Sequence, residues 1–210
     1  MGLKERRGKE KDTRKKLILS SARSLFFQKG FNKVTVDEIA KSSELGKGSI
    51  YLYFNSKEEI YAKILLNDID NFNRLISVLF EKESSASEML TEFSRVYIDV
   101  FLNDSELFRI LMTYMLQPAK MNLTEKLNSQ ILNANARSID VIGKILQRGV
   151  DSKEFHPQID IRQNQNAFWG LLNGIISLFI FSVAEKKRRE RIYSTTKLAL
   201  EIFVRGLKEA

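Results

Sequence analysis

One short stretch carries side chains that could bind a polyanion together. A helix beginning at about Lys47 would turn an apolar face inward, and that face holds Ile50, Tyr53 and Phe54. Its outward side holds Lys47, Ser49, Tyr51 and Leu52. Lysine donates to guanine edges or phosphate, hydroxyl groups bond phosphate oxygens, and leucine can meet a thymine methyl group. The pattern therefore favours recognition of double-stranded DNA over an ordinary solvated surface, on which an exposed tyrosine and leucine would be unusual.

The elements that must position this helix are predicted from local signals. Thr35 and Glu38 have the spacing of a capping box, which starts a short helix that ends before a polar turn at residues 42–46. Two short helices joined by such a turn form a helix-turn-helix, whose second helix can lie in the major groove. Apolar residues recur at intervals of three and four from Asp12 to Gly30 and predict a third, preceding helix.

The net charge lies in the same part of the chain. Residues 1–57 hold 14 Lys or Arg and 6 Asp or Glu, which accounts for the whole net charge of +8, and residues 58–210 are balanced. A localised positive field suits a polyanion, because phosphate contacts release condensed counterions. Residues 1–11 show no apolar periodicity and are predicted to form a flexible basic arm. A solvated tail without a partner is the alternative interpretation of this arm.

Length and composition bound the remainder. The chain has 210 residues, no cysteine, two prolines and ten glycines, which favours long helices and excludes disulfides and thiolate chemistry. No apolar stretch follows the basic N-terminus, so no signal peptide is expected. Capping patterns at Ser85, Asn103, Asn122 and Asp160 predict further helices. We expect an all-α fold of about nine helices, the later ones near residues 56–80, 86–102, 104–116, 123–149, 161–184 and 190–208.

The N-terminal part resembles a known family. Residues 39–41, 48–54 and 56–59 are similar to the signature of TetR-family bacterial transcriptional regulators, and Ala22, Leu25, Phe26, Gly30, Phe31 and Thr35 fit the family's first helix and its exit. The likeness covers roughly residues 12–65. It implies an all-α homodimer that binds a palindromic operator, usually as a repressor released by a small molecule. It also implies a DNA-binding domain at 12–55 and an effector-binding and dimerisation domain at 56–210.

The resemblance assigns roles to positions of this sequence. Phosphate contacts would fall to Thr35, Tyr51, Tyr53 and Lys57, and groove contacts to Lys47, Gly48, Ser49 and Leu52. Two positions depart from the family pattern. Glu44 stands where the turn usually has glycine, so the backbone there is either not left-handed or strained by roughly 1 kcal/mol. Gly46 stands where Ser or Thr usually caps the second helix, at a loss of a few tenths of a kcal/mol.

Residues 167–184 carry no charge over 18 positions, which is the lower limit for a membrane span. A membrane-tethered interaction protein is therefore the alternative function. Internal polar residues, the short length and an amphipathic helix that follows favour burial at a subunit interface instead. The basic run at 186–189 is interpreted as a solvated turn. The predicted dimer interface holds Gly170, Gly174, Ser177, Leu198, Ile202 and Phe203.

Aromatic and methionine side chains are dense in the middle of the chain. Spacing alone favours a core, and the functional interpretation is the wall of an apolar effector pocket between helices. The residues predicted for such a pocket are Phe93, Tyr97, Phe101, Phe108, Met112 and Trp169. Few charges fall on the inward faces, so an effector would be hydrophobic or aromatic.

No constellation for catalysis or metal binding is found. His156 is the single histidine and has no cluster of carboxylates or cysteines around it, so neither a metal nor a cofactor is expected. The sequence predicts a cytoplasmic bacterial protein that is not an enzyme. Its partners would be an operator in double-stranded DNA, a small effector and a second copy of the chain.

Overall fold

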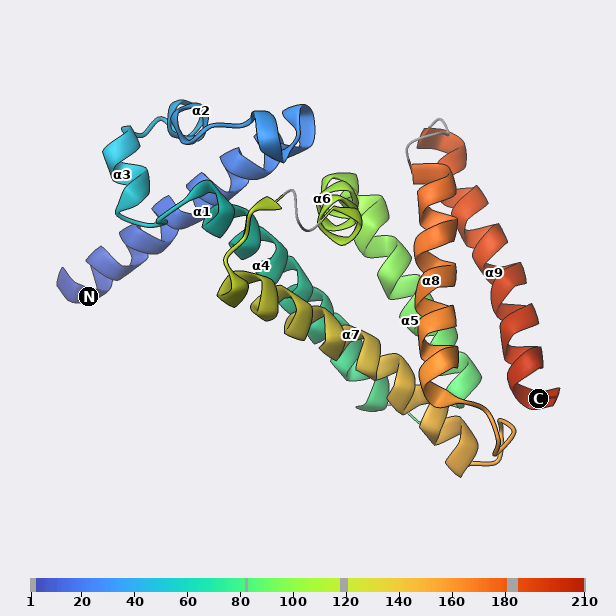
Figure 1. Cartoon of the computed structure of the whole chain (residues 1–210). Helices are drawn as coiled ribbons and strands as arrows, with labels where there is room; N and C mark the ends of the chain where they lie inside the picture. Colours follow the sequence, from blue (N-terminus) through green and yellow to red (C-terminus); the bar gives the residue numbers. More distant parts are fainter. Residues whose placement is uncertain (1–2, 82, 118–120, 181–184, 210) are drawn as a thin grey trace. The chain divides into compact units, whose positions relative to one another are not determined.

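The computed structural model describes residues 3–81, 83–117, 121–180 and 185–209. Within these ranges it contains nine α-helices, two short 3-10 helices and no strand, which confirms the all-α prediction (Figure 1). The helices are α1 (Leu3–Lys29), η1 (Phe31–Lys33), α2 (Val36–Ser42), α3 (Lys47–Tyr51), α4 (Lys57–Ser77), η2 (Val78–Glu81), α5 (Ala86–Asn103), α6 (Ser105–Leu116), α7 (Glu125–Asp151), α8 (Ile161–Ile180) and α9 (Glu185–Glu209).

The chain divides into two compact units that interleave along the sequence. The first comprises residues 1–68 and 106–132, and the second comprises 69–105 and 133–210. Helices α4 and α7 each contribute residues to both units. These are units of packing, and the functional domains at 12–55 and 56–210 stay a prediction.

The first unit is built on an aromatic triangle. The rings of Phe26, Phe31 and Tyr61 lie 5.0–5.5 Å apart between centroids, in tilted and edge-to-face pairs. The Tyr61 hydroxyl donates to the Ile110 carbonyl at 2.6 Å, which ties α4 to α6. Burial raises the pKa of this phenol well above its usual value. Ile50, on α3, is also buried in this unit.

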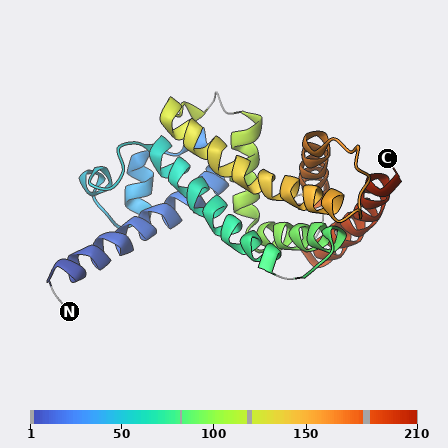
Figure 2. The ribbon, with the colours of Figure 1, turned by 90° about the horizontal axis from the view of Figure 1, so that it is seen from below.

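The second unit has a larger aromatic core. Rings of α4, α5 and α8 pack around Tyr97, whose hydroxyl donates to Asn173 at 2.8 Å. The ends of α4 and α7 lie side by side (Figures 1 and 2), and the Ser138 hydroxyl donates to Asn73 across them at 2.8 Å. Helices α8 and α9 pack against each other, and α9 also packs against α5.

Several helix starts were predicted correctly from caps. The Ser85 hydroxyl accepts the backbone N–H of Glu88, and the Glu88 carboxylate returns to the Ser85 N–H at 2.9 Å, which completes a capping box. This pairing lowers the pKa of Glu88. At α8 the Asp160 carboxylate accepts the N–H of Gln163 at 2.9 Å. Local side-chain chemistry therefore sets these boundaries.

Other helix starts differ from the prediction. The first helix begins at Leu3 instead of Asp12, so residues 3–11 are helical, and Glu10 pairs with Arg14 at 2.8 Å one turn apart. The last helix begins at Glu185, so the predicted turn at 186–189 is wrong and this basic run is helical. Arg189 pairs there with Asp99 of α5 at 2.8 Å. Residues 181–184, the end of the predicted 161–184 helix, lie outside the described residues.

Two predicted caps are also wrong. Asn103 cannot cap α6, because α5 continues through Asn103 and α6 begins at Ser105. At α7 the hydroxyl of Thr124 accepts the backbone N–H of Leu127 at 3.3 Å, in place of the predicted Asn122. Asn122 has a φ of 48° and therefore belongs to the preceding turn.

Candidate nucleic-acid interface

The helix-turn-helix begins on a complete capping box. The Thr35 hydroxyl accepts the N–H of Glu38 at 3.2 Å, and the Glu38 carboxylate accepts the N–H of Thr35 at 2.9 Å. Lys29, at the end of α1, donates to the same carboxylate at 2.6 Å. Lys29 and the two Thr35 bonds lower the pKa of Glu38 to about 2. The start of α2 is thus fixed to α1 by a charge-assisted hydrogen bond.

The turn is held by a buried hydroxyl and contains one left-handed residue. Ser43 is buried, and its hydroxyl bonds the carbonyls of Ile39 and Ala40 at 2.8 and 3.2 Å. Glu44 follows with a φ of 54°, so of the two alternatives left by the sequence the strained left-handed backbone is the one present. This conformation costs a residue with a Cβ roughly 1 kcal/mol.

The second helix of the motif is short and starts without a side-chain cap. Gly46 has extended backbone, and its carbonyl accepts the N–H of Ser49 at 2.8 Å. Helix α3 covers five residues and is anchored by buried Ile50 and Phe54. Lys47, at its start, pairs with Asp37 of α2 at 2.8 Å, and this hydrogen bond raises the Lys47 pKa.

The outward side of α3 matches the expectation at most positions. Tyr51 and Leu52 are 48% and 76% exposed, and Lys47 and Gly48 are exposed as well. Tyr53 is half-buried, so its placement at the core was wrong in part, and it is available to an outside ligand. Thr35 is exposed, and Ser49 is half-buried.

The residues after α3 connect it to α4. The Lys57 ammonium donates to the Phe31 carbonyl at 2.9 Å and lies 4.4 Å from the centre of the Phe31 ring. The Ser56 hydroxyl accepts the N–H of Glu59 at 3.1 Å, as a cap should. The Glu59 carboxylate returns to the N–H of Asn55 at 2.7 Å and not to that of Ser56. Glu59 therefore bonds the residue before the N-cap, and a complete capping box is not formed at Ser56.

Helices α1 and α4 are joined by a largely buried ion pair. Arg23 and Asp68 meet through two nitrogen–oxygen contacts of 2.9 and 3.1 Å. Such parallel contacts fix the orientation of both groups. The Ser21 hydroxyl also donates to the Ser42 carbonyl at 3.3 Å, which holds the turn against α1.

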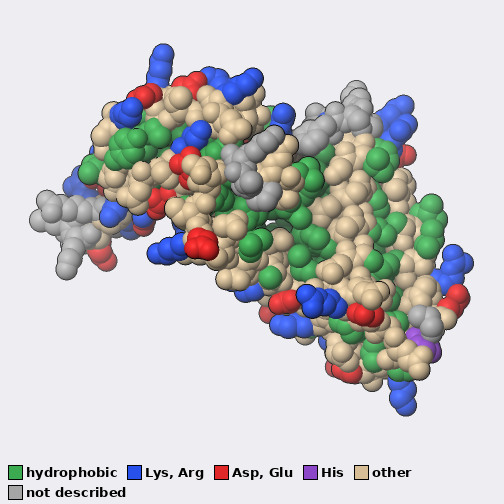
Figure 3. Space-filling model, viewed as in Figure 1, with side chains coloured by type: hydrophobic (Ala, Val, Ile, Leu, Met, Phe, Trp, Pro, Cys, Tyr) green, Lys and Arg blue, Asp and Glu red, His purple; other side chains and the backbone are tan. Residues whose placement is uncertain are grey.

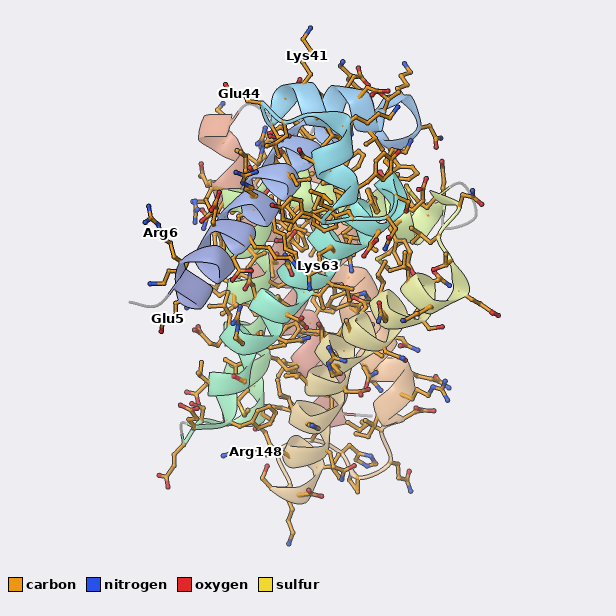
Figure 4. All side chains as sticks on the ribbon, turned by 90° about the vertical axis from the view of Figure 1, so that its left-hand side faces the viewer. Glu5, Arg6, Lys41, Glu44, Lys63 and Arg148 are labelled. Carbon is orange, nitrogen blue, oxygen red and sulfur yellow. The ribbon has the colours of Figure 1, made fainter. Side chains whose placement is uncertain are left out.

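The first turns of α1 present a basic surface next to α3. Arg6 points away from α1, and Lys41 points outward from the end of α2 near Glu44 (Figure 4). Lys11 and Arg14, with Glu10 that pairs with Arg14, line a hollow of about 460 Å³ together with Leu52 and Tyr53. Cations of α1 are thus neighbours of the exposed end of α3. Sequence reasoning placed residues 1–11, which include Lys11, in a separate flexible arm and missed this neighbourhood.

The N-terminal helices, called the head below, are similar to a known protein family. Residues 18–64, which span α1 to the start of α4, match the bacterial regulatory proteins of the tetR family. Within this segment the chain is similar to the DNA-binding part of TetR-family regulators. It is therefore a sequence-specific DNA-binding transcriptional regulator, as the sequence predicted.

Individual relatives extend the likeness beyond residues 18–64. The HTH-type transcriptional regulator YfiR of Bacillus subtilis is 27% identical over 195 residues, covering 91% of this chain and 92% of YfiR. The negative regulator of the biofilm operon, IcaR of Staphylococcus aureus, is 34% identical over 76 residues, covering 36% of this chain and 41% of IcaR. The crystal structure of FadR from Bacillus subtilis in complex with stearoyl-CoA has a TM-score of 0.75 and 20% identity, covering 90% of this chain and 96% of that one.

The predicted dimer interface forms one exposed face of α8 and α9. Gly170, Gly174 and Ser177 are exposed on α8, and Leu198 and Ile202 are 58% and 55% exposed on α9. Phe203 is half-buried and packs on Phe168. Figure 3 shows hydrophobic side chains gathered along these two helices. Among the described helices none has the length and hydropathy needed to span a bilayer, so the membrane-tethered alternative is not favoured.

The six residues predicted for an effector pocket fall into both units. Phe93, Tyr97, Phe101 and Trp169 pack on one another or on neighbouring rings in the core of the second unit. Phe108 and Met112 belong to the first unit. Among the described residues no group of three potential metal ligands is close enough to hold an ion.

Proposed function

We propose that this regulator is a homodimeric repressor that binds a palindromic operator and is released by a small apolar effector. The observation that carries the proposal is the exposed pair Tyr51 and Leu52 on a helix that follows a DNA-binding turn, within the segment that holds the net positive charge. Two exposed hydrophobic side chains beside so many cations favour a polyanionic partner that also offers apolar groups.

In this proposal Thr35, Tyr51, Tyr53 and Lys57 contact phosphate, and Lys47, Gly48, Ser49 and Leu52 reach the groove. The Lys47–Asp37 pair is exposed, and such pairs contribute little to stability, so DNA can replace Asp37 as the partner. Lys57 uses one proton on the Phe31 carbonyl and keeps two for phosphate.

The first turns of α1 extend the proposed contact. Because Lys11 and Arg14 line the hollow beside Leu52 and Tyr53, a duplex on α3 would bring its flanking phosphates to these cations. Each contacted phosphate changes the slope of log affinity against log salt by about 0.9.

The test is binding of the full chain to DNA flanking its own gene, measured by gel shift at several salt concentrations. We expect a sequence-selective complex whose salt slope falls by about 2 in the Lys11→Ala/Arg14→Ala variant. The matched control is Lys126→Ala/Lys144→Ala, which removes two exposed cations of α7. Absence of any sequence-selective complex would contradict the function, and an unchanged slope would contradict only the contribution of α1.

Repression and release by an apolar effector rest on the relatives. IcaR is named as a negative regulator, and the FadR structure holds stearoyl-CoA, in which a long apolar acyl chain is joined to an anionic coenzyme A group. Two subunits must place their α3 helices about 34–36 Å apart to enter successive major grooves, so an effector that tilts α4 would change operator affinity. Stearoyl-CoA is the first effector to add to the gel shift, and a regulator of this kind would work in the bacterial cytoplasm.

A further inference from the structure

A groove of about 580 Å³ lies between α5 and α9 in the second unit. It is separate from the six residues predicted for the effector, none of which lines it. Its volume is within the range of small-molecule sites, which run from about 300 to 1,000 Å³. The residues that matter below are Ser94 and Ile98 on α5, and Thr196, Lys197, Leu200 and Val204 on α9.

The walls of the groove are mainly apolar. Ile98 and Leu200 are buried in the fold and Val204 is half-buried, and all three border the open space. Burial of apolar ligand surface against such walls favours binding. The groove therefore suits a molecule with a compact apolar body.

Two of the hydroxyl groups that line the groove belong to buried side chains. Ser94 is buried and donates to the Leu90 carbonyl at 2.8 Å, so its proton is committed. Thr196 is 3% exposed, and its hydroxyl has no hydrogen-bond partner among the described residues. Helical threonine populates two rotamers about χ1, and a change between them exchanges the hydroxyl with the methyl group. A buried hydroxyl without a partner is unfavourable, and after this rotamer change a ligand acceptor would supply the missing partner.

The charges at the rim balance one another. Arg95 is held by Glu92 and Asp99 at 2.6 and 3.2 Å, so its charge is neutralised. Lys197 and Glu201 contribute one charge of each sign. An uncharged ligand therefore fits the groove better than an anion or a cation.

The two most exposed apolar residues of the proposed dimer contact on α9 do not line the groove. Thr196, Leu200 and Val204 follow one another at intervals of four along α9, whereas Leu198 and Ile202 lie about half a turn away. Leu198 and Ile202 of the predicted dimer interface thus lie on the side of α9 opposite to Thr196, Leu200 and Val204.

We propose that the α5–α9 groove is a second ligand site, which binds an uncharged apolar molecule carrying one hydrogen-bond acceptor oxygen. The oxygen accepts from the Thr196 hydroxyl, and the apolar body contacts Ile98, Leu200 and Val204. This proposal does not depend on DNA binding or on the effector predicted for the core.

The test uses two probes of nearly equal shape, acetophenone and cumene. In cumene a methyl group replaces the carbonyl oxygen of acetophenone. The full chain, methyl-labelled at Ile, Leu and Val, is titrated with each probe, and the titration is followed by NMR. We expect both probes to shift the methyl signals of Ile98, Leu200 and Val204 with saturation. Thr196→Val should weaken acetophenone about fivefold and leave cumene within twofold, because one hydrogen bond contributes about 1 kcal/mol.

The matched control is Thr195→Val, which makes the same change at the neighbouring position outside the groove lining. It should leave both dissociation constants unchanged. The proposal is overturned if neither probe shifts these methyl signals in the unmodified protein, a result that does not require any variant to fold. It is also overturned if Thr196→Val weakens both probes equally, or if benzoate, the charged analogue, binds more tightly than acetophenone.

Discussion

Two surfaces of this regulator leave large hydrophobic side chains in water, and their surroundings differ. At the end of α3, Tyr51 and Leu52 are exposed beside Lys47 and the basic turns of α1. Along α8 and α9, exposed leucine and isoleucine alternate with small residues, and the backbone of α8 is bare at two glycines. The first surface is carried by five helical residues, and the second by two long helices.

The difference shows how the neighbours of an apolar side chain select its partner. Cations around Tyr51 and Leu52 favour a polyanion, in which phosphates flank thymine methyl groups. Small residues such as Gly170 and Gly174 allow the close approach of another helix, which favours a second copy of the same chain. Each surface can be broken separately, and the expected effects differ in size.

The largest effect is expected from Ile202→Glu. A charge at this position would lie in the proposed helix–helix contact, so the dimer should dissociate and operator affinity should fall at least 100-fold, since a single head binds one half-site. Sedimentation velocity gives the mass, and gel shift gives the affinity. Lys197→Glu, on the other side of α9, should stay dimeric. A dimeric Ile202→Glu protein with unchanged operator affinity would remove this face from the proposed interface.

A smaller effect is expected on the α3 surface. Tyr51→Ala should weaken binding to the operator and to random DNA alike by about tenfold, because a phosphate contact is independent of sequence. Lys47→Ala should change the ratio between the two instead. Fluorescence anisotropy with both duplexes measures this ratio, and Leu75→Ala, an exposed apolar residue of α4, is the control. Equal losses for Tyr51→Ala and Leu75→Ala would contradict a role for Tyr51.

A modest gain of stability is expected in the turn. Glu44→Gly should raise the free energy of unfolding by about 0.5–1 kcal/mol, because glycine adopts a φ of 54° without steric cost. Glu44→Ala keeps the Cβ and should not. Both variants remove one negative charge and should strengthen DNA binding equally. Urea unfolding separates the two effects, and equal stability of the two variants would show that the backbone is unstrained.

The smallest effect concerns pH. The Glu38 pKa is lowered to about 2, so its hydrogen bonds to Lys29 and Thr35 hold α2 at all pH values above about 4.5 and are lost only as the pH falls toward 2. Carboxyl NMR should show a titration midpoint well below that of an ordinary glutamate. Lys29→Ala should raise the midpoint, because the Lys29 hydrogen bond is the largest cause of the shift. A midpoint of about 4.5 in the unmodified protein would contradict this.

The head could be predicted from the sequence because its signals are local. The capping box at Thr35 joins residues three apart, and the exposed side of α3 follows from helical spacing over five residues. The same holds for the caps at Ser85 and Asp160. Where the prediction was wrong, as at Asp12 and 186–189, a charged helix without apolar periodicity was interpreted as irregular chain.

The remaining features join residues far apart in the sequence. The Lys57 ammonium donates to the Phe31 carbonyl, 26 residues earlier in the sequence, and the Tyr97 hydroxyl donates to Asn173, 76 residues later. The α5–α9 groove arises where two helices separated by more than 80 residues fail to fill the space between them. The spacing of apolar residues in either helix does not predict such a gap.

The hydrogen bond from Tyr61 to Ile110 has a consequence for dissecting the protein. A fragment that stops at residue 68 lacks α6. The Tyr61 hydroxyl then loses its acceptor, and the apolar surface that α6 covered becomes exposed. Exchange of sensor modules between regulators of this family is therefore best designed with three junctions, so that α6 and the first two turns of α7 travel with the DNA-binding head. A single cut would give a head that aggregates during expression, whatever its intrinsic affinity for the operator.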